Sequence, residues 1–405
     1  MANLPTLACL NDNINVSDEE LVRDYFEKGF TYLEIKEFLN VKHDIKISLS
    51  TIKRWLRKMG LFRRALIHRR TSIPDIEIAV QSQLQGSGAQ LGYRRIWAHL
   101  SRQGIIARKE DIRKCILQLD PLGVDLRRRG RLRRRKYCNP GPNSAWHLDG
   151  HDKLKPYGFS IHGCIDGYSR RLLWLEVAST NKKPALVAKY YLNAVKQLKG
   201  VPKTLKADDG TEHSLIEPIH ICLREPTAGN TASNSFSIVS SPVNQRIESY
   251  WSKLRKDRPG WWKSFFEDMI DLELFNADNP VLVDCLRFCF MHIIRDELYS
   301  VANEWNQHLI SKSLNGGPSG RPDTMFFLPH LYNAPNNLQN VDVNDVDEFY
   351  ATITGIPMPL DYSEEFQKFA DTVMAIHNVQ MSSNAETGLN LYMFFAGKLS
   401  NIPKW

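Results

Sequence analysis

The chain has 405 residues, of which 42% are hydrophobic, 10% aromatic and 24% charged. This composition is typical of a folded globular protein and excludes a largely disordered chain. One hydrophobic core rarely serves so many residues, so we expect two to four domains. No apolar run reaches the roughly 18 residues that cross a bilayer, and Met1 to Leu21 lacks the pattern of a secretory signal. We therefore expect no membrane partner and no secretion.

The formal net charge of +8 favours an anionic partner such as nucleic acid. Eight of the ten residues from Arg127 to Lys136 are basic. So many like charges do not pack together, so we expect an exposed segment that contacts a phosphate backbone, serves as a nuclear import signal, or is a solvated linker. We expect a nuclear protein on this basis. The predicted DNA contacts in the run are Arg127, Arg128, Arg129, Arg131, Arg133, Arg134 and Arg135.

The seven cysteines are an odd number spread along the chain, which does not indicate a disulfide framework. The spacing nearest to that of a metal site is formed by Cys285, Cys289 and His292, which lack a second pair of ligands nearby. We predict buried structural side chains at these three positions.

The first 70 residues are expected to form a helix-turn-helix module. Ser17 precedes a first helix that ends near Gly29, a second covers 32–39, and Ser50 caps a third that stops at Gly60. The third helix is basic, as a recognition helix is, and an ordinary charged surface helix is the alternative. Its predicted DNA contacts are Lys53, Arg54, Arg57 and Lys58.

Residues 71–138 are expected to form a second small helical module that ends in the arginine run. Apolar residues recur at helical spacing in two stretches between Gly88 and Leu119. The breaker Asn139-Pro140-Gly141-Pro142 then marks a domain boundary.

Residues 139–276 are expected to form an α/β domain. The pattern predicts strands over 145–149, 159–165, 172–177, 204–208 and 235–240, and helices over 185–198 and 214–223. Ser241-Pro242 is expected to begin one more helix. The order βββαβαβα is that of a ribonuclease H-like mixed sheet with flanking helices. Residues 277–405 are expected to be mainly helical, with a long helix over 280–309, a turn over 315–322 and no predicted role.

Three acidic residues lie where this fold brings distant parts of the chain to one edge of the sheet. Asp149 is on the first strand, Asp208 ends the fourth, and Glu248 is on the helix after the last. Carboxylates are the natural ligands of hard cations, and two magnesium ions roughly 4 Å apart serve both the attacking and the leaving oxygen of phosphodiester transfer. Taken singly, each acid is more simply a turn, cap or surface residue. The nearest rivals are Asp152, just past the first strand, and Asp166, in a predicted turn.

The chain resembles the integrase core of retroviruses and related transposons, which belongs to the DDE recombinase superfamily. The resemblance covers about Trp146 to Arg255 and rests on four segments in the family order, Trp146-His147-Leu148-Asp149-Gly150, Ile165-Asp166-Gly167-Tyr168-Ser169-Arg170, Lys206-Ala207-Asp208-Asp209-Gly210-Thr211-Glu212-His213 and Asn244-Gln245-Arg246-Ile247-Glu248. It implies that Asp149, Asp208 and Glu248 are the catalytic residues and the ligands of two Mg²⁺ or Mn²⁺ ions. It also implies duplex DNA of the transposon-end type as substrate and a homo-oligomer.

The chain departs from the family at three points. Asp209 stands where the family usually has asparagine, which leaves Asp208 and Asp209 as alternatives for the second ligand; the strand-end residue Asp208 is preferred. The spacing to Glu248 is longer than in retroviral enzymes, with the extra residues expected in a loop over 227–235. No zinc site of two histidines and two cysteines precedes Asp149. Helix-turn-helix modules in its place favour a transposon, or a host gene derived from one, as the origin.

Two features near Glu248 have open roles. Lys253, Arg255 and Lys256 are predicted either to hold DNA phosphates or to form a solvated helix face. Trp261 and Trp262 are expected in the core, with stacking on unpaired bases as the alternative.

The leading hypothesis is a metal-dependent polynucleotidyl transferase that cuts and joins DNA strands. The alternative is a catalytically silent, domesticated transposon protein that acts as a DNA-binding or assembly factor. A ribonuclease H-type nuclease acting on RNA–DNA hybrids shares the metal chemistry, but the helix-turn-helix modules favour duplex DNA.

Overall fold

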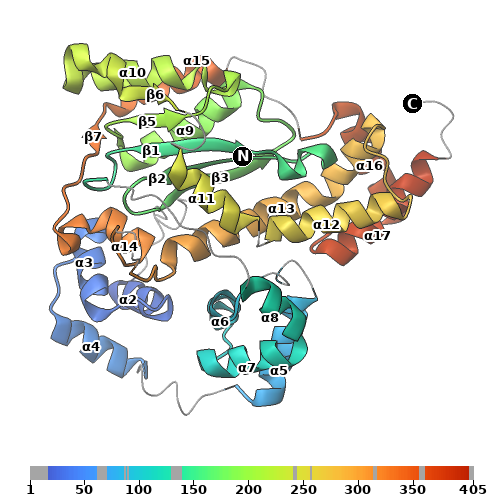
Figure 1. Ribbon diagram of the computed structural model, residues 1–405, viewed down its shortest axis with the longest axis horizontal. Coiled ribbons are helices and arrows are strands. Elements are labelled where there is room, and N and C mark those ends of the chain that lie inside the picture. Colours follow the sequence, from blue (N-terminus) through green and yellow to red (C-terminus); the bar gives the residue numbers. More distant parts are fainter. Residues whose placement is uncertain are drawn as a thin grey trace.

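A computed structural model describes residues 17–61, 71–85, 88, 91–128, 139–239, 244–255, 258–312, 317–354 and 361–400. A mixed sheet with helices on both faces forms the largest part, and two small groups of helices lie beside it (Figure 1). This is the predicted α/β architecture with helical regions before and after it.

The first group contains α2 (Asp18–Glu27), α3 (Tyr32–His43) and α4 (Leu49–Lys58), which pack around a shared apolar core. Ser17 caps α2 in a reciprocal capping box with Glu20, as the sequence suggests. The prediction for α4 was wrong by two residues, because its N-cap is Ser48 and not Ser50. The Ser48 hydroxyl accepts a hydrogen bond from the Thr51 N–H at 3.1 Å.

The second group contains α5 (Ile73–Leu84), α6 (Tyr93–Arg102), α7 (Lys109–Leu119) and α8 (Pro121–Arg128). Of these, α6 and α7 carry the two predicted apolar stripes, and α5 and α8 are additions to the prediction. Residues 129–136 of the arginine run lie outside the described residues, as do the side chains of Arg127 and Arg128.

Five strands form the central sheet in the order β3-β2-β1-β5-β6. They are β1 (Trp146–His151), β2 (Ser160–Asp166), β3 (Leu172–Ala178), β5 (Leu205–Ala207) and β6 (Phe236–Ile238). The first three form an antiparallel meander, whereas β5 and β6 run parallel to β1. The five predicted strands and the ribonuclease H-like order are confirmed.

The helices between and after these strands are α9 (Pro184–Leu198), α10 (Ile216–Ala228), α11 (Gln245–Leu254) and α12 (Arg258–Asp271). Short 3₁₀ helices follow β1 and β5 as η3 (Asp152–Tyr157) and η4 (Thr211–His213). The predicted loop over 227–235 was wrong, because α10 extends to Ala228 and η5 (Gly229–Ser235) fills the rest. The predicted helix start at Ser241-Pro242 lies outside the described residues, and α11 begins three residues after Pro242.

The two faces of the sheet have separate cores, because side chains alternate along each strand. Trp146 and Leu148 of β1 pack with α9 and α10 on one face, together with α15 (Val343–Thr354). On the opposite face, α11 and α13 (Pro280–Gln307) pack against the sheet. The helices α12, α16 (Glu364–His377) and α17 (Ala385–Leu399) pack against α13 in the same core (Figure 1). The C-terminal helices therefore share their core with the sheet.

A second, two-stranded sheet joins β4 (Gly200–Val201) to β7 (Gln339–Asn340). It ties the segment after α9 to the C-terminal region, which also contains α14 (Pro322–Phe327) and η6 (Pro329–Tyr332).

Both N-terminal helix groups contact the region after the sheet. α3 meets α14, where the Thr324 hydroxyl donates to Glu34 Oε1 at 2.9 Å and Arg321 donates to the Gly29 carbonyl at 2.7 Å. α6 meets α13, where His99 Nδ1 lies 3.0 Å from Glu304 Oε1. Although burial raises the pKa of Glu304, the hydrogen bond from His99 and nearby arginines lower it more strongly. The two groups are thereby held beside the sheet domain.

Two further expectations concern buried side chains. Cys285 and Cys289 are fully buried in α13, as predicted. His292 is only partly buried, so that part of the prediction was wrong, and its ring bonds to the Ser382 carbonyl at 2.7 Å. Trp262 is buried in the core as expected, with Trp261 packed against it.

Among the described helices, none has the length and apolar character needed to span a membrane.

Candidate active site

Asp149 and Asp208 lie on neighbouring parallel strands. Trp146 pairs with Leu205 and His147 with Lys206. Continuing this register by two residues brings Asp208, directly after β5, beside Asp149 on β1. The sheet thus brings together two carboxylates that are 59 positions apart in the sequence (208 − 149 = 59).

Trp251 of α11 fixes the Asp149 carboxylate. Its indole N–H donates to Asp149 Oδ2 at 2.8 Å, and its ring stacks on His151 with centroids 5.0 Å apart. Gly163, the β2 partner of Asp149, makes room for this ring, because a Cβ there would lie 2.7 Å from the indole carbon Cη2. A glycine opposite the aspartate is therefore part of how the site is built.

The start of α11 is tied to β1, which positions Glu248 near Asp149. The Asn244 amide donates to the Leu148 carbonyl at 2.9 Å, and its Oδ1 accepts from His147 Nδ1 at 2.7 Å. Burial lowers the pKa of His147 to about 4, so the imidazole is neutral and donates only from Nδ1. Two turns of helix then carry Glu248, whose side chain is partly exposed, and the buried Trp251.

The electrostatics show that the three acids interact. Burial, together with the negative charges of Asp208 and Glu248, raises the pKa of Asp149 to about 7, against the hydrogen bond from Trp251. Such a group of carboxylates without a neutralising partner is unfavourable. A hard divalent cation would offset this repulsion, and oxygen ligands suit Mg²⁺ or Mn²⁺. The residues present therefore fit a metal site.

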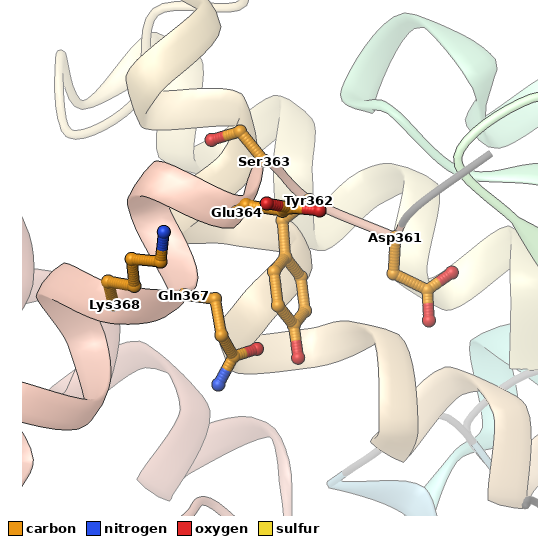
Figure 2. Close-up of a pocket in the computed structure, with 6 residues that line it drawn as sticks. All are labelled: Asp361, Tyr362, Ser363, Glu364, Gln367 and Lys368. Atoms are coloured by element: carbon orange, nitrogen blue, oxygen red, sulfur yellow. The ribbon is translucent and has the colours of Figure 1, made fainter.

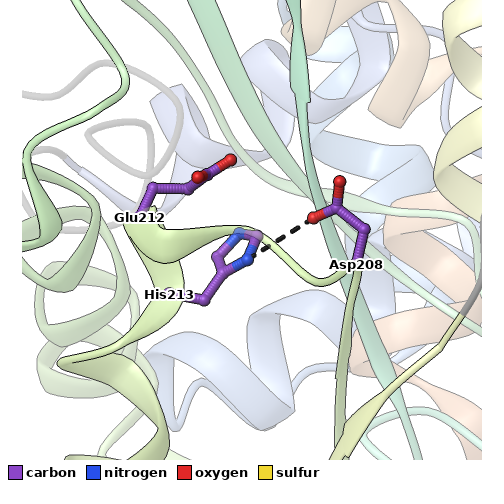
Figure 3. Close-up of side chains that lie close together, drawn as sticks. All are labelled: Asp208, Glu212 and His213. Atoms are coloured by element: carbon purple, nitrogen blue, oxygen red, sulfur yellow. Dashed lines mark ion pairs between the residues drawn. The ribbon is translucent and has the colours of Figure 1, made fainter.

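Asp208 has two further neighbours that the sequence interpretation did not assign. His213 Nδ1 lies 3.5 Å from Asp208 Oδ1, and ligand atoms of Asp208, Glu212 and His213 all lie within 4.8 Å of one another (Figure 3). Burial lowers the pKa of His213, while Glu212 and Asp208 act in the opposite direction. The sequence contained a signal for these neighbours, since Glu212 and His213 end the segment Lys206 to His213, which contains Asp208.

The rival aspartates have structural roles. Asp166 is fully buried and accepts hydrogen bonds from the backbone N–H groups of Asn143, Tyr168 and Ser169. It organises the turn between β2 and β3, as predicted. Asp152 forms an exposed ion pair with Lys155 on η3.

The basic residues predicted to contact DNA divide into three groups. Lys53, Arg54, Arg57 and Lys58 are all exposed on α4, and Lys58 pairs with Glu19 at 3.1 Å. On α11, Arg255 is exposed, whereas the Lys253 ammonium lies over the Trp305 ring, 4.4 Å from its centroid. Lys256 and the arginine run from Arg129 lie outside the described residues.

A shallow pocket at the start of α16 is lined by Asp361, Tyr362, Ser363, Glu364, Gln367 and Lys368 (Figure 2). None of these is among the acids described above. Asp361 is paired with Arg295 at 2.8 Å, which gives it a structural role. We therefore place the chemistry at the sheet edge.

Comparison with protein families shows which known domain this fold matches. Residues 136–331 match the family model of the integrase core domain. This part of the chain is an integrase core domain. The match reaches beyond residue 276 into α13 and α14, as does the shared hydrophobic core. A search of curated proteins found no match to the chain. The integrase core supports a DNA function of the polynucleotidyl transferase type.

Proposed function

We propose that the chain cuts and joins DNA strands, with Asp149, Asp208 and Glu248 as the catalytic metal ligands. The observation that carries this proposal is the parallel pairing of β1 with β5, which places Asp208 beside Asp149 at the sheet edge where the start of α11 is bonded to β1. Three carboxylates that repel one another at a sheet edge are a costly arrangement for a purely structural site.

The roles of this chain's own residues follow from their contacts. Asp149, Asp208 and Glu248 would hold two divalent cations, either Mg²⁺ or Mn²⁺. When bound, these cations stabilise the charge on the attacking and leaving oxygens of the phosphodiester. Trp251 keeps Asp149 in one orientation, and the Asn244 contacts with β1 keep α11 at the sheet edge. Such surrounding contacts tune how tightly ligands bind metal.

The substrate we propose is duplex DNA of the transposon-end type, bound by the basic face of α4. The exposed side chains of Lys53, Arg54, Arg57 and Lys58 support this, since phosphate contacts need accessible cations. We also propose self-association and a nuclear location, the latter because of the basic run that begins at Arg127. The boundaries near residues 70, 138 and 276 remain predictions.

The test is cleavage and joining of labelled DNA duplexes with Mg²⁺ or Mn²⁺, comparing wild type with Asp208→Asn and Asp209→Asn. Asp209 is exposed, whereas Asp208 contacts His213. We expect Asp208→Asn to abolish both reactions with DNA binding retained, and Asp209→Asn to keep activity within about threefold. Loss in Asp209→Asn alone would move the second ligand to that residue.

The competing function is that of a domesticated DNA-binding or assembly protein without turnover. It predicts that wild type binds DNA but neither cuts nor joins any end supplied with either metal. That result would overturn the proposed activity.

A further inference from the structure

His213 is a buried histidine beside Asp208. Its side chain is only 3% exposed, and neither ring nitrogen has a hydrogen-bond partner of normal geometry among the described residues. Burying such a group without a partner is unfavourable. Its ring lies edge-on to His162, with centroids 5.8 Å apart, and its Nδ1 is directed toward Asp208 (Figure 3).

The Asp208 carboxylate faces this imidazole through its Oδ1 atom. Its Oδ1 is buried and has no hydrogen-bond partner within the described ranges, although it lies only 3.5 Å from His213 Nδ1. This separation is too long for a normal hydrogen bond. In a tetrahedral site with bonds of about 2.1 Å, neighbouring ligand atoms are about 3.4 Å apart. The pair therefore has the spacing of two ligands of one ion.

Glu212 supplies a third ligand atom. A carboxylate oxygen of Glu212 lies within 4.8 Å of the nearest Asp208 and His213 ligand atoms. Gly210 makes this position accessible, since a Cβ at that residue would lie 2.6 Å from the Glu212 carboxylate. The short helix η4 thus presents Glu212 and His213 together beside the end of β5.

We propose that Asp208, Glu212 and His213 hold one divalent transition-metal ion. A set of two carboxylates and one imidazole suits Zn²⁺ or Mn²⁺, whereas Mg²⁺ prefers oxygen ligands and its own waters. The inference rests on the proposed function in one respect, because Asp208 is also one of the three proposed catalytic ligands. Under this inference, Glu212 and His213 determine which divalent metal the site prefers.

The experiment titrates the untagged full-length chain with Zn²⁺, Mn²⁺ and Mg²⁺ in a calorimeter. The variants are His213→Gln and Glu212→Gln, with Glu217→Gln as control because Glu217 is a nearby, partly exposed acid outside the cluster. We expect Zn²⁺ and Mn²⁺ affinities to fall at least tenfold in both cluster variants and to stay unchanged in the control. Mg²⁺ affinity should change less than threefold in His213→Gln.

Pulsed EPR of bound Mn²⁺ gives a second readout. Nitrogen coupling from an imidazole ligand should appear in wild type and disappear in His213→Gln. If His213→Gln does not fold, Glu212→Gln decides the question, because its side chain is partly exposed and the change is conservative. Wild-type Zn²⁺ and Mn²⁺ affinity in a folded cluster variant, or Mn²⁺ without nitrogen coupling in wild type, would overturn the inference.

These outcomes are separable from those of the proposed function. A wild type that binds Zn²⁺ and Mn²⁺ through this cluster but never cuts DNA would retain the metal site and refute the strand transferase. A wild type that cuts DNA with unchanged Zn²⁺ and Mn²⁺ affinity in both cluster variants would do the reverse.

Discussion

Replacing Trp251 by phenylalanine isolates one hydrogen bond at the proposed site. The indole N–H donates to Asp149 Oδ2 at 2.8 Å, and it is one of the contacts that lower the pKa of this carboxyl. Trp251→Phe keeps an aromatic ring in the space beside Gly163 but removes the donor. The carboxylate anion then loses stabilisation relative to the protonated acid.

The magnitude follows from ordinary values for such bonds. A hydrogen bond to a charged group contributes about 1.5–3 kcal/mol. Since one pKa unit corresponds to about 1.4 kcal/mol, the pKa of Asp149 should rise by roughly one to two units above its value of about 7. Metal binds the anion, and the ionised fraction of Asp149 at pH 7 falls from about one half to between about 10% and 1%, so Mg²⁺ affinity at pH 7 should fall by about 5- to 50-fold.

The assay measures Mg²⁺ affinity and cleavage rate between pH 6 and pH 9. Both profiles should move to higher pH in Trp251→Phe, because more alkaline conditions are needed to ionise Asp149. Trp262→Phe is the matched control. Trp262 is also buried, and its indole N–H donates at 2.8 Å to Glu297, which is not one of the three acids. Unchanged profiles in Trp251→Phe, or the same shift in the control, would refute this reasoning.

Three further predictions concern stability and DNA binding. Burial raises the pKa of Glu176 to about 7 in the folded protein, from a value near 4.5 in the unfolded chain. The folded state therefore loses stability as the pH rises from about 4.5 to about 7, and the total loss is about 3 kcal/mol. Glu176→Gln should therefore raise Tm more at pH 8 than at pH 5, and an equal gain at both would contradict this. Gly163→Ala should lower Tm by several degrees and weaken Mg²⁺ binding, because its Cβ would displace Trp251; crystals with the indole unmoved would count against it. Arg54→Ala with Arg57→Ala should weaken DNA binding and reduce its salt dependence, and an unchanged salt slope would remove α4 from the interface.

The strands and their order were predictable because their signals are local. β3 is a run of mainly apolar residues, β2 carries Ile161, Cys164 and Ile165, and both strands end at turn residues, a pattern that needs no tertiary information. The cap of α4 was placed wrongly because Ser48, Ser50 and Thr51 are all capping residues within four positions. Only the backbone conformation at Ser48 distinguishes them.

The site was predictable in its acids but not in its supporting contacts. Trp251 belongs to the buried face of α11, but its bond to Asp149 depends on the packing of α11 over β1 and on Gly163. The environment of His213 also arises from tertiary burial. Sequence spacing gives the order of such residues, whereas their burial and unused atoms appear only in the folded chain.

The assignment of Glu248 tests the central claim most directly, because this residue reaches the sheet edge from a separate helix. The measurement is joining of a labelled DNA end to a second duplex with Mg²⁺ or Mn²⁺, comparing wild type, Glu248→Gln and Ser252→Ala. Ser252 is an exposed residue one turn further along α11 whose hydroxyl donates to the Glu248 backbone carbonyl at 3.1 Å, which makes it the control. The account predicts joining by wild type and Ser252→Ala and at least a hundredfold loss in Glu248→Gln with DNA affinity retained. Wild-type joining by Glu248→Gln would contradict the three-carboxylate site.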